Sequence, residues 1–187
     1  MNGLDLFSQT QVVGDYSDCK FDDLKTMFEV GMLPRAVKVR AGDVIDSIEF
    51  IYDRNDYPVG KSPFFHGGPN GYDNVFTIPT GDFLRKVDIE YGKYKYSLDP
   101  NQQKKDQIIR IRFTTNQGVQ SPWYGNACGK GSSLPATSST IDVGEDNIIC
   151  CLYGATGLPN MTLHNYLQAV GFYMISFMEA RNLRLLE

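Results

Sequence analysis

Apolar and polar residues alternate along much of this chain. The clearest runs are "KVDIEYG" at residues 86–92 and "IIRIRFTT" at residues 108–115. A period of two residues is typical of a β-strand with one buried face and one wet face. The same interpretation fits the apolar residues Val37, Val39, Ile48, Phe50 and Tyr52 and, less regularly, the segments "NVFTIP", "NIICCLY" and "LQAVGFYMISF".

Turn-forming clusters separate these predicted strands. They are rich in Gly, Pro and Asn and read "HGGPNGYDN", "DPNQQKKD", "GNACGKGSS" and "GATGLPN". Evenly spaced strands with turns between them favour an antiparallel sandwich, barrel or prism. Only the last stretch, "MEARNLRLLE", has good helix formers without Gly or Pro, and we expect a short helix or a frayed tail there.

One phrase occurs three times along the chain. The copies read "GDVIDSIEFIY", "GDFLRKVDIEY" and, more weakly, "HNYLQAVGFYM", beginning at Gly42, Gly81 and His164. Three related strands in one chain predict an internally threefold domain in which each unit presents a similar loop. The fifth place of the phrase differs between the copies: it is Asp46, then Arg85, then Gln168.

The size and charge of the chain limit its class. Its 187 residues are enough for one domain with a sizeable core, which we expect at residues 1–177 with a tail at residues 178–187. A net charge of −4 without a basic run argues against a nucleic-acid partner. No apolar run approaches the roughly 20 residues of a membrane span. No signal peptide is visible, so we expect a protein that is cytoplasmic or secreted without one.

Four cysteines, at positions 19, 128, 150 and 151, match no metal-binding spacing. Cys150 and Cys151 lie in an apolar strand, where we expect buried free thiols on opposite faces. A disulfide between Cys19 and Cys128 stays open as an alternative in an oxidising compartment, because both residues fall in predicted loops.

The two histidines do not form a reactive or metal-binding arrangement. Neither His66 nor His164 has a second plausible metal ligand nearby in the sequence, and neither is set beside a nucleophile. We therefore expect no metal, no cofactor and no enzymatic activity.

The ordered set of segments resembles the jacalin-related lectins, which are β-prism domains of three four-stranded Greek-key sheets. The matching segments cover residues 10–177 and read "FDD", "GDVIDSIEFIY", "HGGPNG", "PTGDFLRKVDIEYG", "IRFTTNQG", "SPWYG" and "YLQAVGFY". The resemblance implies binding of mannose- or glucose-type glycans without a metal, at loops on one end of the prism.

By this resemblance the family's main site is altered. A Gly-x-x-x-Asp loop before the last strand normally faces a glycine-rich N-terminal loop, because vicinal sugar hydroxyls need an ionised carboxylate beside backbone N–H donors. Here His164 and Gln168 replace the glycine and the aspartate of that loop, and Ser17 and Asp18 stand where a pair of glycines is usual. The remaining residues of this altered site are Tyr166, which either stacks on a sugar or packs internally, and Leu167.

The first copy of the phrase offers a second candidate site. Gly42, Asp43, Val44, Ile45 and Asp46 fit the Gly-x-x-x-Asp pattern, and two-site members of the family pair this loop with a glycine loop, here Gly67 and Gly68. By that resemblance the two aspartates accept sugar hydroxyls, the main chain of Val44 and Ile45 donates, and a glycine covers the ring. The alternative is that each aspartate only bonds the backbone of its own turn.

Single sites of this kind are weak, so useful avidity argues for a homo-oligomer or for multivalent glycans. The rival hypothesis is a protein-interaction or membrane-active scaffold whose sugar loops have decayed. The altered main site and the C-terminal tail motivate it.

Overall fold

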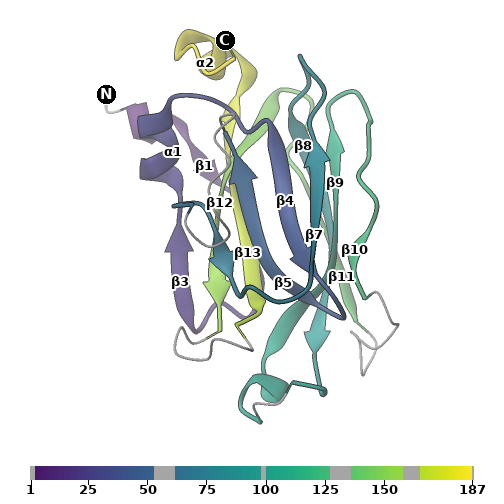
Figure 1. Cartoon of the computed structure of the whole chain (residues 1–187). Helices are drawn as coiled ribbons and strands as arrows, with labels where there is room; N and C mark the ends of the chain where they lie inside the picture. Colours follow the sequence, from purple (N-terminus) through teal and green to yellow (C-terminus); the bar gives the residue numbers. More distant parts are fainter. Residues whose placement is uncertain (1–2, 53–61, 98–99, 127–135, 158–164, 187) are drawn as a thin grey trace.

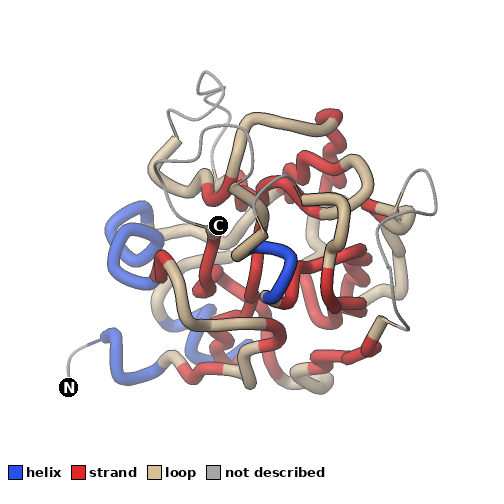
Figure 2. The backbone as a smooth tube through the Cα atoms, turned by 90° about the horizontal axis from the view of Figure 1, so that it is seen from below, coloured by secondary structure: helices blue, strands red, loops and turns tan. Residues whose placement is uncertain are grey.

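Three antiparallel sheets enclose one interior, which confirms the predicted all-β prism (Figure 1). The computed structural model describes residues 3–52, 62–97, 100–126, 136–157 and 165–186. Seen from below, the strands of the three sheets surround a common centre (Figure 2).

The second and third sheets have four strands each. The second has the order β6-β5-β4-β7, with β4 (Ala36–Ala41), β5 (Ile45–Ile51), β6 (His66–Gly67) and β7 (Tyr72–Thr77). The third has the order β10-β9-β8-β11, with β8 (Leu84–Lys93), β9 (Asp106–Thr115), β10 (Tyr124–Gly125) and β11 (Thr137–Asp142).

The first sheet joins the two ends of the chain. Its order is β1-β13-β12-β3, and a fifth short strand, β2, also pairs with β13. The strands are β1 (Ser8–Gln9), β2 (Val13–Gly14), β3 (Cys19–Asp22), β12 (Asn147–Thr156) and β13 (Leu167–Ser176). Because β1 and β2 pair with successive parts of β13, they share the place of one edge strand.

Each sheet contributes a fully buried phenylalanine to the core. Phe50 comes from β5, Phe113 from β9 and Phe172 from β13, and the rings of Phe50 and Phe172 lie 6.2 Å apart. These positions belong to the alternating apolar sets that the sequence predicts to face inward. The hydrophobic pattern therefore specifies which face of each sheet is buried.

Two α-helices and two 3₁₀-helices lie among the described residues. Helix α2 (Phe177–Asn182) confirms the predicted C-terminal helix, and its Ser176 Oγ accepts a hydrogen bond from the Glu179 N–H. The expectation of no other helix is wrong, because α1 (Leu24–Val30) follows β3 and ends at Gly31 in a left-handed conformation. The 3₁₀-helices are η1 (Gly3–Leu6) and η2 (Gln102–Lys104).

One predicted turn is part of a strand instead. The sequence predicts a turn at "GATGLPN", but the first three residues of this segment belong to β12. A Cβ on Gly154 would lie 2.2 Å from the Ala169 carbonyl oxygen and 2.7 Å from the Phe21 ring. The glycine is therefore explained by close packing within the sheet, which sequence alone does not separate from a turn.

Cys150 and Cys151 are buried free thiols, as the sequence predicts. They do not follow strict strand alternation, because a register shift lies between Ile149 and Cys151 in the β12–β13 pairing. Burial and a hydrogen bond with Cys150 raise the pKa of the Cys151 thiol. Cys128 lies outside the described residues.

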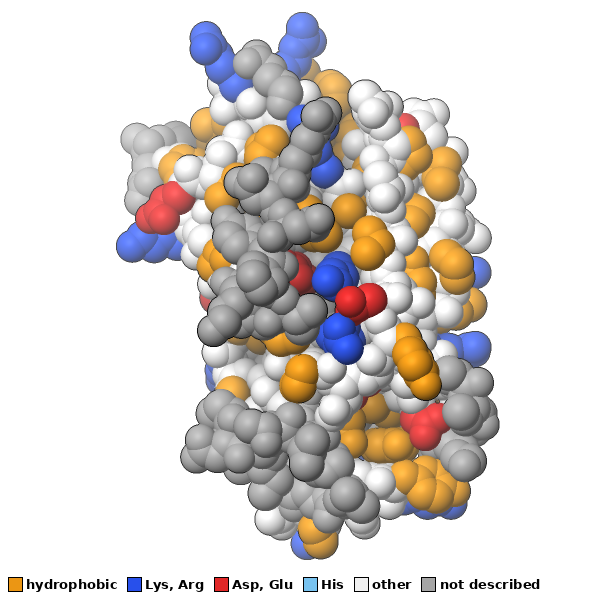
Figure 3. Space-filling model, in the orientation of Figure 1, with side chains coloured by type: hydrophobic (Ala, Val, Ile, Leu, Met, Phe, Trp, Pro, Cys, Tyr) orange, Lys and Arg blue, Asp and Glu red, His pale blue; other side chains and the backbone are white. Residues whose placement is uncertain are grey.

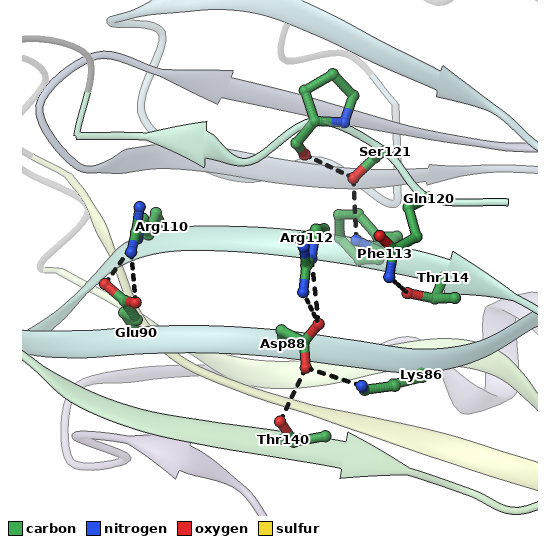
Figure 4. A network of polar contacts seen from close by, with 11 residues as sticks. Lys86, Asp88, Glu90, Arg110, Arg112, Phe113, Thr114, Gln120, Ser121 and Thr140 are labelled. Carbon is green, nitrogen blue, oxygen red and sulfur yellow. Dashed lines mark hydrogen bonds and ion pairs between the residues drawn. The ribbon is translucent and has the colours of Figure 1, made fainter. Parts of the chain in front are cut away.

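The outer face of the third sheet carries a polar network (Figure 4). Arg110 forms a two-pronged ion pair with Glu90, at 2.7 and 2.6 Å, and Arg112 pairs with Asp88 at 2.8 Å. The guanidinium groups of both arginines also lie over the Trp123 ring, 4.6 and 4.8 Å from its centroid. The Trp123 ring thus covers the solvent-facing side of β9, where it attracts the two cationic guanidinium groups.

We expect Trp123→Ala to lower the free energy of unfolding by about 1 to 2 kcal/mol, since exposed cation–π contacts are worth about 0.5 to 1 kcal/mol each. Trp123→Phe keeps a ring over the arginines and should recover part of this loss. Urea denaturation monitored by circular dichroism measures both. Equal stability of the alanine variant and the parent protein would show that the stacking contributes nothing.

Candidate functional site

The threefold repeat has a common structural basis. Strands β5, β8 and β13 each begin with a register shift that leaves one residue without a cross-strand partner. That residue is Asp46 in β5, Arg85 in β8 and Gln168 in β13. The fifth place of the repeated phrase is therefore a β-bulge in every sheet. Because a bulge re-aims a side chain, the residue at this place decides what each loop offers.

Glycines close around the bulge residue of the second sheet. The Gly68 N–H donates to the Asp46 carbonyl oxygen at 2.9 Å. Gly67 has φ +121°, and a Cβ there would lie 2.1 Å from the same oxygen. A Cβ on Gly71 would lie 2.5 Å from Asp46 Oδ2. Only residues without a side chain fit so close to Asp46, which leaves backbone and carboxylate facing each other.

Arg40 holds the glycine loop in place from β4. Its guanidinium donates to the carbonyl oxygens of Asn70 and Gly71, each at 3.0 Å, and to Asp73 Oδ1 at 2.5 Å. This positive charge also favours ionisation of Asp46.

Burial dominates the ionisation of Asp46, which is 5% exposed. Loss of solvation, with a smaller contribution from Asp43, raises the pKa of Asp46 to about 7. Arg40 and the Gly42 N–H oppose this shift. The carboxyl group therefore changes charge near neutral pH.

Asp43 lies in the turn of the β4–β5 hairpin. The Tyr94 hydroxyl donates to Asp43 Oδ2 at 3.3 Å, and the Asn126 N–H donates to the Asp43 carbonyl oxygen at 3.2 Å. Its other carboxylate oxygen, Oδ1, is buried and has no hydrogen-bond partner in the described part of the chain. Its neighbours Val44 and Ile45 bury their side chains, so only their main chain can meet a ligand.

The third repeat supplies the far wall of this site. Asn165 packs its backbone against Gly68, since a Cβ there would lie 2.7 Å from the Asn165 carbonyl oxygen. Asn165 Oδ1 is a second buried acceptor without a partner among the described residues. Tyr166 packs edge-on against Tyr94, with ring centroids 5.6 Å apart, in a cluster with Val44. Tyr166 thus belongs to the surroundings of the Asp43–Asp46 loop.

Comparison with known proteins identifies the family to which this arrangement belongs. A family model described as the Jacalin-like lectin domain matches residues 10–173. The chain belongs to the jacalin-like lectin family. Horcolin of Hordeum vulgare is 22% identical over 139 residues, which are 74% of this chain and 80% of that protein.

Solved structures share the fold of this jacalin-like lectin. The structure of an artocarpin–mannotriose complex superposes with a TM-score of 0.61 at 23% identity, covering 89% of this chain and 98% of artocarpin. The V. cholerae biofilm matrix protein Bap1 gives a TM-score of 0.62 at 20% identity over 90% of this chain. The present chain spans only 23% of the length of Bap1.

The altered main site of this lectin is covered by its own chain. Gln168 is fully buried, and its Nε2 donates to Gln102 Oε1 of η2 at 2.5 Å. Lys105 pairs with the Asp18 carboxylate and donates to Ser17 Oγ at 3.3 Å. Although partial burial opposes the change, hydrogen bonds from Lys105 and Gln168 lower the pKa of Asp18. The β8–β9 connection thus covers this site and occupies Asp18 Oδ1 and Gln168 Nε2, while Asp18 Oδ2 and Gln168 Oε1 stay buried without a partner among the described residues.

The main site has a loop equivalent to the glycine loop of the second sheet, but other residues than the predicted ones form it. The Asp15 N–H donates to the Gln168 carbonyl oxygen at 3.1 Å, as Gly68 does to Asp46. Gly14 has φ +102°, and a Cβ there would lie 2.1 Å from that oxygen, as at Gly67. Gly14 and Asp15, and not Ser17 and Asp18, therefore occupy the place of the second sheet's glycine pair.

The loop of the third sheet offers no comparable acceptor. Arg85 forms ion pairs with Asp142 Oδ1 at 3.3 Å and Glu145 Oε1 at 3.9 Å. A guanidinium only donates hydrogen bonds, so this bulge lacks the carboxylate of its counterpart in β5.

The described ranges contain neither a cluster of metal ligands nor a helix that could span a membrane. No group of three or more His, Cys, Asp or Glu residues within them could hold a metal ion. His66 Nε2 lies 2.8 Å from Asp23 Oδ1, and its ring stacks on Phe21 with centroids 3.8 Å apart. His164 lies outside these ranges. No helix within them is long and apolar enough to cross a membrane.

Sequence reasoning missed several residues around the site. Tyr94 and Asn165 come from other repeats than Asp46, and Gln102 and Lys105 reach the main site from the β8–β9 connection. No local motif marks these residues. The threefold repeat is the one signal that predicts loops of different units at a common end of the prism.

Proposed function

We propose that this chain binds carbohydrate at the Asp43–Asp46 loop, without a metal and without a catalytic step. The observation that carries the proposal is a pair of buried acceptors without partners in the described chain, Asp43 Oδ1 and Asn165 Oδ1. They belong to the two loops that flank Asp46 and Gly68. A ligand rich in hydroxyl donors supplies what these acceptors lack, because a buried polar group without a partner is costly.

The proposed ligand class is mannose- or glucose-type sugars. Vicinal hydroxyls match an ionised carboxylate that accepts two hydrogen bonds, and glycines let the ring approach the main chain. The likeness to artocarpin, whose structure was solved with mannotriose, supports this class. A single shallow site corresponds to a millimolar dissociation constant, or about −4 kcal/mol.

Titration of the protein with methyl α-mannoside, followed calorimetrically, tests the proposal. Saturable binding that depends on Asp46 supports it. If a broad glycan array and this titration both show no binding, the carbohydrate proposal fails. The chain would then fit the rival function of a protein- or membrane-binding scaffold, which the self-covered main site favours.

The variant Gln168→Ala distinguishes sugar binding at the main-site loop from sugar binding at the Asp43–Asp46 loop. We expect this variant to keep the affinity of the parent for methyl α-mannoside, because Gln168 is sealed beneath Gln102. It should lower the free energy of unfolding by about 1 to 3 kcal/mol, since Gln102 Oε1 loses a buried donor. Calorimetric titration and urea denaturation measure the two effects. Loss of sugar binding without unfolding would return the working site to the main loop.

A further inference from the structure

Exposed aromatic side chains are rare on the described surface. Among the large apolar residues classed as exposed there, the aromatic ones are Tyr72, Tyr96 and Phe177, with 78%, 50% and 38% of their surfaces in solvent. Phe177 begins α2 at the upper end of the prism (Figure 1). The two tyrosines belong to segments that build the proposed sugar site.

Each tyrosine is linked through one neighbouring residue to one of the two carboxylates. Tyr72 directly follows Gly71, where a Cβ would lie 2.5 Å from Asp46 Oδ2, and it pairs with Ala41 at the start of the β4–β5 hairpin. Tyr96 packs against Tyr94, with ring centroids 6.1 Å apart, and the Tyr94 hydroxyl donates to Asp43. Figure 3 shows acidic and apolar side chains next to each other at the lower right, where Figure 1 places the β4–β5 hairpin.

The apolar face of an exposed ring gains free energy when a ligand removes it from water. Tyrosine combines a large apolar face with a polar tip, and its apolar face suits the C–H face of a pyranose. The Lys95 ammonium lies 5.1 Å from the Tyr96 ring centroid, yet half of the residue stays exposed. Both rings are carried by segments in which a neighbouring residue contacts one of the hydroxyl acceptors.

We propose that Tyr72 and Tyr96 form stacking subsites on either side of the Asp43–Asp46 loop, and that the ligand is an oligosaccharide of at least two residues. One sugar ring binds at the carboxylates, and its neighbours in the glycan lie on the tyrosine rings. This inference rests on the proposed function and adds chain length as the basis of specificity.

The test compares methyl α-mannoside with a linear mannotriose by calorimetric titration of four proteins. These are the parent chain, Tyr72→Ala, Tyr96→Ala and, as a matched control, Phe177→Ala at the other end. Each tyrosine is exposed, so the substitutions should leave the thermal unfolding temperature nearly unchanged, and melting curves check this.

We expect the parent to bind mannotriose about 10-fold or more tightly than the monosaccharide, since a stacked ring is worth a factor of about 3 to 10. Each tyrosine variant should lose about that factor for mannotriose and less than about 2-fold for methyl α-mannoside. Phe177→Ala should change neither affinity.

The outcomes separate this inference from the proposed function. If methyl α-mannoside binds at Asp46 but mannotriose binds no more tightly, or if both tyrosine variants match the parent, the stacking subsites are refuted and the proposed function stands. If the parent binds neither sugar, the proposed mannose-type function fails, and the subsites fail with it.

Discussion

Asp46→Asn is expected to abolish detectable sugar binding while making the folded protein more stable at pH 8. The carboxylate is the charged acceptor of the site, and hydrogen bonds to a charged group contribute about 1.5 to 3 kcal/mol each. Losing two of them weakens binding by a factor of about 100 or more. From a millimolar starting point, no binding would be measurable.

The stability effect has the opposite sign. Burial raises the pKa of Asp46 from 3.8 to about 7, so the folded state favours the protonated form. The contribution of this group to stability is complete below pH 3.8 and is lost as the pH rises through about 7. Asparagine has the same shape and never ionises. At about 1.4 kcal/mol per pKa unit, the variant gains up to about 4 kcal/mol at pH 8 and nothing at pH 4.

Urea denaturation at pH 4 and pH 8 and calorimetric titration with methyl α-mannoside measure the two effects. Asp146→Asn, which changes an exposed carboxyl beside α2, is the matched control and should alter neither. A variant that binds sugar as the parent does would remove Asp46 from the site. A variant destabilised at pH 8 would show that the carboxylate supports the fold.

The second large effect is a loss of sugar affinity in acid. Asp46 is mostly protonated below pH 7, and a protonated carboxyl accepts hydrogen bonds less strongly than a carboxylate. We expect the association constant to fall toward 10-fold per pH unit below about 7, or about 50-fold between pH 7 and pH 5. Binding should release a proton in that range.

The two tyrosines near Asp46 do not mask this effect. Burial raises the pKa of Tyr166 to about 12, and burial together with Asp43 raises the pKa of Tyr94. Both tyrosines are therefore neutral between pH 5 and pH 8. Protonation of Asp46 in acid does not destabilise the fold, because the protonated carboxyl group favours the folded state.

Calorimetric titrations at pH 5, 6, 7 and 8, in two buffers with different ionisation enthalpies, measure the affinity and the protons released. The Gln168→Ala variant should follow the same profile as the parent. A parent affinity that is flat between pH 5 and pH 8 would mean that ionisation of Asp46 does not govern binding.

Local patterns predicted the fold well because the strands obey a period of two and each inward face is apolar. Phe50, Phe113 and Phe172 illustrate this, since each lies on the apolar side of its strand and is buried. The repeated phrase also predicted equivalent loops. It could not show that its fifth place is a β-bulge, because a bulge depends on the pairing with the neighbouring strand.

Contacts between distant segments set the limits of prediction. From the sequence, Gln168 is predicted to be a weakened sugar contact. In the structure it is covered by Gln102 of the β8–β9 connection, which lies 66 residues away in the chain. The sequence also contains no sign that Asp46 is buried or that Tyr94 reaches Asp43, because these facts depend on how the loops of different sheets meet. Glycines were ambiguous for the same reason, as Gly154 in β12 shows.

The most direct test of the working site is a titration of ¹⁵N-labelled protein with methyl α-mannoside at pH 8, followed by NMR. Sugar binding at the Asp43–Asp46 loop predicts saturable shifts of the backbone amides at residues 42–46 and at Gly67 and Gly68, with the Gln168 side-chain amide signal unshifted. Shifts centred on Gln168 and residues 14–18, with residues 42–46 unchanged, would contradict it.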